Sequence, residues 1–216
     1  MTTPEMMTTE RSRLRRLPNR GSHDPKVIHA ILDAAFLAHV GFQTNSQPFV
    51  IPTLYGREQD KLYLHGSATS RMLGELVGGA PACVTVTLFD GLVLARSAFH
   101  HSMNYRSVVA FGAARKLEET DKKTRALSSI SEHLLQGRWK DVRPPTEREL
   151  KATTVLEFTI EEAWAKIRQG PPLDDEDDYS LPVWAGFIPM KLEAQAPEPD
   201  CNGITLPPYA LCRRGK

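Results

Sequence analysis

The stretch that decides the fold is Cys83-Val84-Thr85-Val86-Thr87-Leu88-Phe89-Asp90-Gly91-Leu92-Val93-Leu94-Ala95. Its first seven residues alternate in the period of two that is typical of a half-buried β-strand. Asp90-Gly91 can supply the positive φ angles of a type I′ turn. The sequence therefore predicts a β-hairpin here, which returns through residues 92–95.

Further strands are predicted on both sides of this stretch. They cover residues 36–42, 49–55, 61–65, 105–117, 154–167 and 184–192. Pro52 removes one hydrogen-bond donor from its strand. This places the strand at a sheet edge or a bulge, where the unpaired side of the backbone can face a ligand.

Helices are predicted between these strands. One begins at Asp24-Pro25, with Asp24 as N-cap and Pro25 at the first helical position. The others cover residues 67–77 and 120–136, and a short turn begins at the capping box Thr146-x-x-Glu149. With about seven strands and no regular βαβ alternation, the pattern predicts an antiparallel β-barrel with peripheral helices.

The composition is that of an ordinary globular protein, with 41% hydrophobic and 25% charged residues. A formal net charge of +1 argues against a nucleic-acid partner. Three cysteines without CxxC spacing, no secretory h-region and no long apolar stretch predict a cytoplasmic protein without a membrane span. We expect a flexible leader over residues 1–21, one domain over 22–195 and a Pro-rich tail over 196–216. The basic run at residues 11–20 is either a solvated arm or a phosphate-binding arm.

One short segment, His65-Gly66-Ser67-Ala68-Thr69-Ser70-Arg71, could bind a phosphate. It joins a predicted strand to a predicted helix that begins at Ser67, and a helix start favours anions. Its hydroxyl groups are donors, and Arg71 could grip phosphate oxygens. The alternative is an ordinary helix cap with Arg71 in solvent.

Four segments, in this order, resemble the pyridoxamine 5′-phosphate oxidase-like FMN-binding split-barrel family, above all its flavin-nucleotide-binding or nitroimidazole-resistance-like branch. The segments are residues 48–55, 63–71, 104–112, and 166–168 together with 184–189. The resemblance covers roughly residues 22–195. It implies a mainly β, antiparallel, Greek-key split barrel with FMN as cofactor, FAD and deazaflavin being less expected.

The resemblance also implies which residues would lie at the flavin. The cofactor-binding residues would be Pro52, Thr53, Leu54, Tyr55, His65, Ser67, Ser70, Arg71, Tyr105, Arg106, Ser107 and Trp184. The strand at Pro52 would lie along the isoalloxazine ring, and the segment at Arg71 would hold the phosphate. Trp184 would reach the cofactor from the partner chain of a homodimer.

The function implied is that of an FMN-dependent oxidoreductase acting on a small molecule, with NAD(P)H as a candidate electron donor. The alternatives are a non-catalytic flavin carrier and a haem-binding split-barrel relative. The second set of basic residues that a true pyridoxamine-phosphate oxidase uses for its substrate is not matched, so that activity is not expected. Catalytic side chains are not assigned, because a flavin carries its own redox chemistry.

The adjacent histidines His100 and His101 invite a metal interpretation. Neighbouring residues on a strand point to opposite faces, and no HxxxH spacing supports them. No metal site is therefore predicted. A loop that borders the flavin pocket is the other interpretation of this pair, and His39 is expected to be packed in its apolar run.

Overall fold

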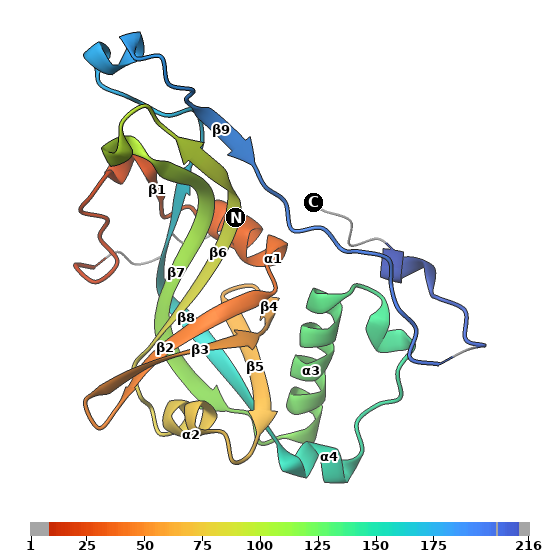
Figure 1. The fold of residues 1–216 in the computed structure, drawn as a ribbon. Helices are drawn as coiled ribbons and strands as arrows, with labels where there is room; N and C mark the ends of the chain where they lie inside the picture. Colours follow the sequence, from red (N-terminus) through yellow and green to blue (C-terminus); the bar gives the residue numbers. More distant parts are fainter. Residues whose placement is uncertain (1–8, 202, 212–216) are drawn as a thin grey trace.

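A single antiparallel sheet of nine strands forms the centre of the molecule (Figure 1). The computed structural model describes residues 9–201 and 203–211. The strands are β1 (Gly21–Ser22), β2 (Leu37–Thr44), β3 (Gln47–Leu54), β4 (Gly56–Glu58), β5 (Lys61–Ser67), β6 (Ala82–Leu94), β7 (Ser102–Lys116), β8 (Thr153–Arg168) and β9 (Gly186–Pro189). The helices are α1 (Pro25–Ala34), α2 (Arg71–Val77), α3 (Thr120–Leu134) and α4 (Glu147–Ala152).

The strand order explains why the barrel is split. It runs β3-β2-β6-β7-β8-β5-β4, with β1 paired to β8 and β9 paired to β6. β3 and β4 end the order on opposite sides and do not pair with each other, so the sheet curls without closing. The antiparallel split barrel with peripheral helices is confirmed.

The β2–β3 hairpin follows directly from its sequence. Asn45 and Ser46 form the turn with φ angles of 49° and 64°, values that asparagine tolerates better than most residues. β3 is an edge strand, as Pro52 predicts. The side chains of Val40 and Phe42 point inward from β2, and the ring of Phe42 stacks on Phe49 with centroids 5.6 Å apart.

The predicted hairpin at Asp90-Gly91 is wrong, because β6 continues through both residues to Leu94. The register with β7 shifts between Phe89 and Gly91, which marks a β-bulge. Gly91 is needed for a close approach: a Cβ atom there would lie 2.2 Å from the backbone oxygen of Ile188 on β9. Long-range pairing thus overrides the local turn signal.

Two further predicted boundaries are wrong. Helix α2 begins at Arg71 with Ser70 as N-cap, because Ser67 still pairs with Thr153 as the last residue of β5. The last strand, β9, covers only Gly186–Pro189. It projects with the ends of β6 and β7 at the top of Figure 1.

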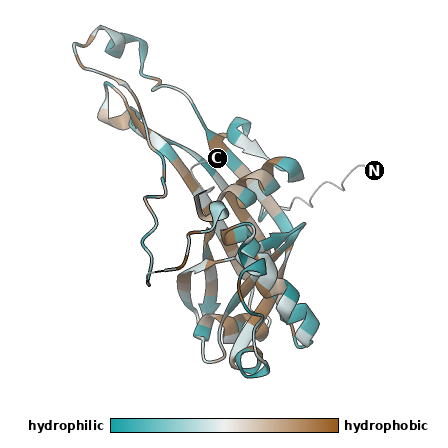
Figure 2. Ribbon diagram, turned by 90° about the vertical axis from the view of Figure 1, so that its right-hand side faces the viewer, coloured by the Kyte–Doolittle hydropathy of each residue, from teal (hydrophilic) through white to brown (hydrophobic). Residues whose placement is uncertain are grey.

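The main core lies between the sheet and helices α1 and α2. Ile28 and Leu32 of α1 and Leu73 and Leu76 of α2 are fully or almost fully buried there. A second cluster beneath α3 contains Ala126 and Ile130. Figure 2 shows the hydrophobic residues along the strands and the hydrophilic residues mainly on the surrounding helices and loops. No helix in the part of the chain that the structure describes is long and apolar enough to cross a membrane.

Of the predicted N-terminal leader, residues 9–21 are described, and they lie against β8. The buried carboxylate of Glu162 accepts hydrogen bonds from Thr9 Oγ1 at 2.6 Å, Ser12 Oγ at 2.7 Å and Arg11 Nη2 at 2.5 Å. These bonds hold the pKa of Glu162 down at about 2. Gly21 and Ser22 then pair with Lys166 and Ala165 as strand β1. We call residues 9–20 the N-terminal arm.

Candidate functional site

Residues 65–71, the segment predicted to bind a phosphate, lie next to the edge strand β3. The guanidinium of Arg71 sits 5.2 Å from the centroid of the Phe49 ring on β3, an arrangement typical of a cation–π contact. Arg71 is exposed and makes no ion pair with any described residue. Its charge is therefore available to an anion at the β3 edge.

Hydroxyl groups line the turn between β5 and α2. Ser67 Oγ and Thr69 Oγ1 are 2.9 Å apart, and the Thr69 amide donates to Ser67 Oγ at 3.2 Å. Ser70 Oγ accepts from the amide of Leu73 at 3.4 Å, so this hydroxyl already caps α2. Gly66 keeps the backbone compact, because a Cβ there would come within 3.0 Å of Leu73.

The four predicted residues around β3 divide between surface and core. Pro52 and Leu54 are exposed, and Thr53 is half-buried with its hydroxyl donating to the carbonyl of Leu54. The side chain of Tyr55 is fully buried and donates to the carbonyls of Leu32 and Ala35. Only the backbone of Tyr55 could therefore face a ligand on the surface.

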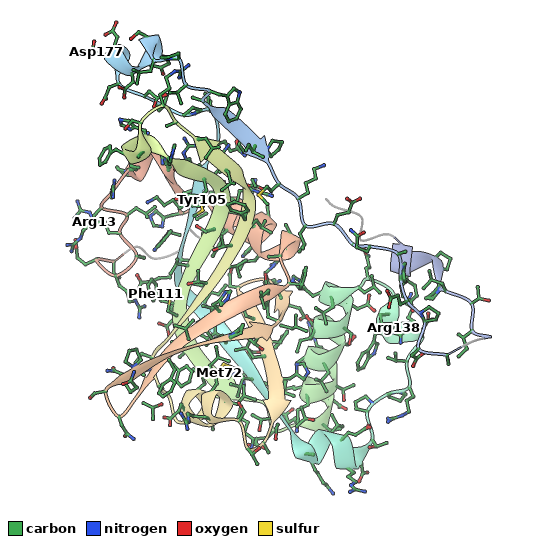
Figure 3. The ribbon with its side chains drawn as sticks, in the orientation of Figure 1. Arg13, Met72, Tyr105, Phe111, Arg138 and Asp177 are labelled. Carbon is green, nitrogen blue, oxygen red and sulfur yellow. The ribbon has the colours of Figure 1, made fainter. Side chains whose placement is uncertain are left out.

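The structure places Tyr105, Arg106, Ser107 and Trp184 away from this segment. Figure 3 shows Tyr105 on the upper part of β7 and Met72, next to Arg71, at the lower end of the barrel. Arg106 is engaged with Asp90 through two bonds of 3.0 and 2.7 Å, which raise the pKa of the guanidinium. Trp184 is 65% exposed just before β9. Within one chain, these residues do not join the group around Arg71.

The outer face of β2 and β3 is apolar and open. Leu37 pairs with Leu54 and Gly41 pairs with Val50, so these side chains share the face opposite the core. Leu37, Val50 and Leu54 are 44%, 64% and 38% exposed. We call Leu37, His39, Val50, Pro52 and Leu54 the outer face. His39, expected to be packed, is exposed on it.

A cavity of about 600 Å³ between α3 and β4 was not anticipated from the sequence. Several of its charged groups already have partners. Arg125 pairs with Glu58 at 2.7 Å, and Glu132 accepts from the amides of Gly137 and Trp139 at 2.7 and 2.8 Å. The bonds to Glu132 stabilise the end of α3, and the ion pair occupies Arg125 and Glu58. Among the residues that the structure describes, no group of three or more His, Cys, Asp or Glu could hold a metal ion.

Comparisons with known proteins identify the family to which this fold belongs. The sequence model of the family described as pyridoxamine 5′-phosphate oxidase matches residues 24–167. The structure of the flavocytochrome Anf3 from Azotobacter vinelandii is 40% identical, with a TM-score of 0.90, and the match covers 96% of this chain and 98% of that chain. The structure of the FAD and heme binding protein from Mycobacterium smegmatis is 34% identical, with a TM-score of 0.85, over 91% and 98% of the two chains.

A more distant structure, a candidate 5-nitroimidazole antibiotic resistance protein from Bacteroides thetaiotaomicron, shares the fold. It is 24% identical with a TM-score of 0.56, and the match covers 68% of this chain and 86% of that chain. None of the curated proteins matches this chain. The family model and the two more similar structures together show that this chain belongs to the pyridoxamine 5′-phosphate oxidase family of split-barrel proteins.

Proposed function

We infer that the protein is a flavin-binding redox protein whose cofactor phosphate is held by the segment from Gly66 to Arg71. The observation that carries this proposal is the unpaired guanidinium of Arg71 beside the edge strand β3. The hydroxyls of Ser67 and Thr69 would add neutral donors to its charge. The outer edge of β3 pairs with no other strand among the described residues, so its backbone groups could bond to the polar edge of a flat ring.

A bound flavin would supply the electron-transfer chemistry, and the chain would bind and orient it. The resemblance of the sequence implies FMN, whereas the Mycobacterium smegmatis relative is named for FAD. We favour FAD on that similarity. Mass spectrometry of the cofactor released from purified protein distinguishes the two. Anaerobic bleaching of the flavin absorbance by NADH or NADPH would favour an oxidoreductase over a carrier.

The proposed site includes a second copy of the chain. The apolar outer face would lose its contact with water if two copies packed together through it, as expected for a homodimer of this family. Such packing could also bring the Tyr105 end of one copy toward the Arg71 end of the other, as the resemblance implies for Trp184.

Haem binding is a second candidate, favoured by the names of the two most similar structures reported above. An axial ligand needs a ring nitrogen with a free lone pair. Five histidines are hydrogen-bonded: His23, His29, His100, His101 and His133. His39 and His65 have no hydrogen bond to a described residue, and partial burial lowers the pKa of His65, which keeps its ring neutral near pH 7. We favour these two as ligands because no hydrogen bond to a described residue fixes either ring, although a histidine that donates from one nitrogen can still ligate through the other. A Soret band that changes in H39A or H65A would identify the ligand.

Replacing Arg71 tests the flavin site. R71A should weaken flavin affinity by about 1.5–3 kcal/mol, the usual scale for losing a hydrogen bond to a charged group. Fluorescence quenching of added flavin measures this affinity in the cofactor-free protein. R148A is the matched control, because Arg148 is an exposed arginine on α4, outside the site. Equal affinities of R71A and wild type would show that the phosphate binds elsewhere.

A further inference from the structure

We propose that the N-terminal arm completes a second binding site, for an organic molecule that carries a phosphate group. The site is a cavity of about 540 Å³ beside Tyr105. Its basic side chains are Arg16, Arg20 and Lys166, and its lining includes no carboxylate. We call it the arm pocket. The arm pocket is distinct from the proposed flavin site. It gives a role to part of the basic run at residues 11–20, to which the flavin site assigns none.

Contacts with β8 hold the backbone of the arm in place. Glu162 anchors the start of the arm through Thr9, Arg11 and Ser12. Lys166 Nζ donates to the carbonyl of Arg16 at 3.2 Å, and the backbone pairing of Gly21 with Lys166 follows. The positions of Arg16 and Arg20 therefore depend on contacts with β8 at both ends of the arm. Such preorganisation lowers the entropic cost of binding.

The charges of the arm divide into two groups. Arg13 and Arg15 pair with Glu10 at 3.0 and 3.1 Å, and Arg11 pairs with Glu162. In contrast, Arg16, Arg20 and Lys166 make no ion pair with any residue in the described ranges 9–201 and 203–211. Three positive charges around one cavity repel one another, and an anion between them would offset that repulsion.

A fourth cation, Arg168, is the strand partner of Tyr105. Arg168 is buried, and its guanidinium donates to Asn104 and to the carbonyls of Gly170 and Pro171. Burial lowers the pKa of Arg168, and the positive charge of Arg20 lowers it further. Arg168 thus adds a further positive charge near Arg20 at this end of the sheet.

The remaining lining suits the body of an organic ligand. His101 Nδ1 accepts from the amide of Ala95 at 2.9 Å, so the neutral ring carries its proton on Nε2 and donates from there. Leu17, Met103 and the ring of Tyr105 add apolar surface. A phosphate monoester carries a charge of about −1.5 to −2 at pH 7, which matches three cations better than a single carboxylate does.

The arm pocket is separate from the Arg71 segment of the same chain. Ser67 pairs with Thr153 at the start of β8, whereas Lys166 lies near its end. These positions are 166 − 153 = 13 residues apart on one strand, which is roughly 40 Å along the strand at about 3.3 Å per residue. In Figure 3, Tyr105 and Met72 mark the two ends. One phosphate could not contact both places in one chain.

Calorimetric titration of the purified, flavin-loaded protein with ADP at low ionic strength tests the proposal, with adenosine as the uncharged probe. We expect ADP to bind, and R16A and R20A to weaken that binding about tenfold or more each. R13A is the matched control on the same arm and should bind ADP as the wild type does. R71A should also leave ADP binding unchanged, which separates this site from the proposed flavin site. Thermal melting of each variant shows that its fold is retained, and flavin absorbance shows that R13A, R16A and R20A keep their cofactor.

The proposal would be overturned if ADP gave no binding heat, or if adenosine bound as tightly as ADP. It would also be overturned if R13A weakened ADP binding as much as R16A and R20A. A protein that lacks flavin but still binds ADP through Arg16 and Arg20 would support the arm pocket and count against the flavin proposal alone.

Discussion

Gly112 is a position in the barrel at which the packing leaves no room for a side chain. The register between β7 and β8 shifts between Phe111 and Gly112, and the backbone of β8 comes very close at that point. A Cβ atom on Gly112 would lie 1.9 Å from the carbonyl oxygen of Thr159. Glycine at this position is therefore a requirement of packing that the predicted strand over residues 105–117 does not reveal.

Gly112→Ala should destabilise the protein by about 1–3 kcal/mol or more, because the added methyl group forces the two strands apart. Urea unfolding measures the change in the free energy of unfolding. The matched control is Gly74→Ala in α2, where the added Cβ meets no atom within 4 Å. That change should be neutral or stabilise by about 0.5–1 kcal/mol, since alanine is the better helix former. Equal losses in both variants would contradict the packing argument.

At the scale of elements, the N-terminal arm depends on one carboxylate. Hydrogen bonds from Thr9, Ser12 and Arg11 lower the pKa of Glu162 to about 2. In the unfolded chain a glutamate has a pKa of about 4.3. The carboxylate therefore stabilises the folded state fully above the unfolded value, and this stabilisation is lost as the pH falls toward about 2.

E162Q should consequently melt at a lower temperature than wild type near neutral pH. The difference between the two melting temperatures should shrink as the pH is lowered from about 4.3 toward 2, because protonation of Glu162 removes the same charge. Differential scanning calorimetry across this range measures it. E161Q is the control, since Glu161 is an exposed neighbour whose ion pair with Arg11 is longer, at 3.5 Å. A difference that stays constant with pH would show that the charge of Glu162 does not hold the arm.

Elements whose signals are local were predictable. The α1 cap at Asp24 and the capping box of Thr146 and Glu149 follow from contacts within a few residues, and both are present. The continuous course of β6 was not predictable, because β9, about a hundred residues later in the chain, decides the conformation at Gly91. The start of α2 was misplaced for the same reason, since the pairing of Ser67 with Thr153 extends β5.

At the scale of the whole molecule, a candidate site was likewise predictable only where its residues are close together in the sequence. Residues 65–71 are contiguous, so their composition alone indicates an anion site, and the structure adds the neighbouring β3. The arm pocket combines Arg16 and Arg20 with Tyr105 and Lys166. These residues are far apart in the sequence, and only the β7–β8 pairing and the docked arm bring them together. The basic run was the one signal that could have indicated it.

The proposed homodimer gives a prediction at this scale. Val50→Asp should convert the dimer to a monomer and reduce its flavin content, because it buries a charge in the apolar outer face. Light scattering after gel filtration measures the mass, and absorbance measures the flavin. Leu192→Asp, at a site that is 81% exposed and outside this face, should change neither. A V50D protein that still has the mass of a dimer would place the interface elsewhere.

The short strand β1 has a consequence for how copies of the chain can associate. On one edge of β8, β5 pairs with residues up to Thr159, the partner of Lys61. Further along the same edge, β1 pairs with Ala165 and Lys166. An uncovered strand edge is a template on which further chains can add without limit. By shielding this edge, β1 removes a growth point and leaves β3 as the long open edge among the described strands. With one growth point fewer, the proposed homodimer would be favoured over a filament.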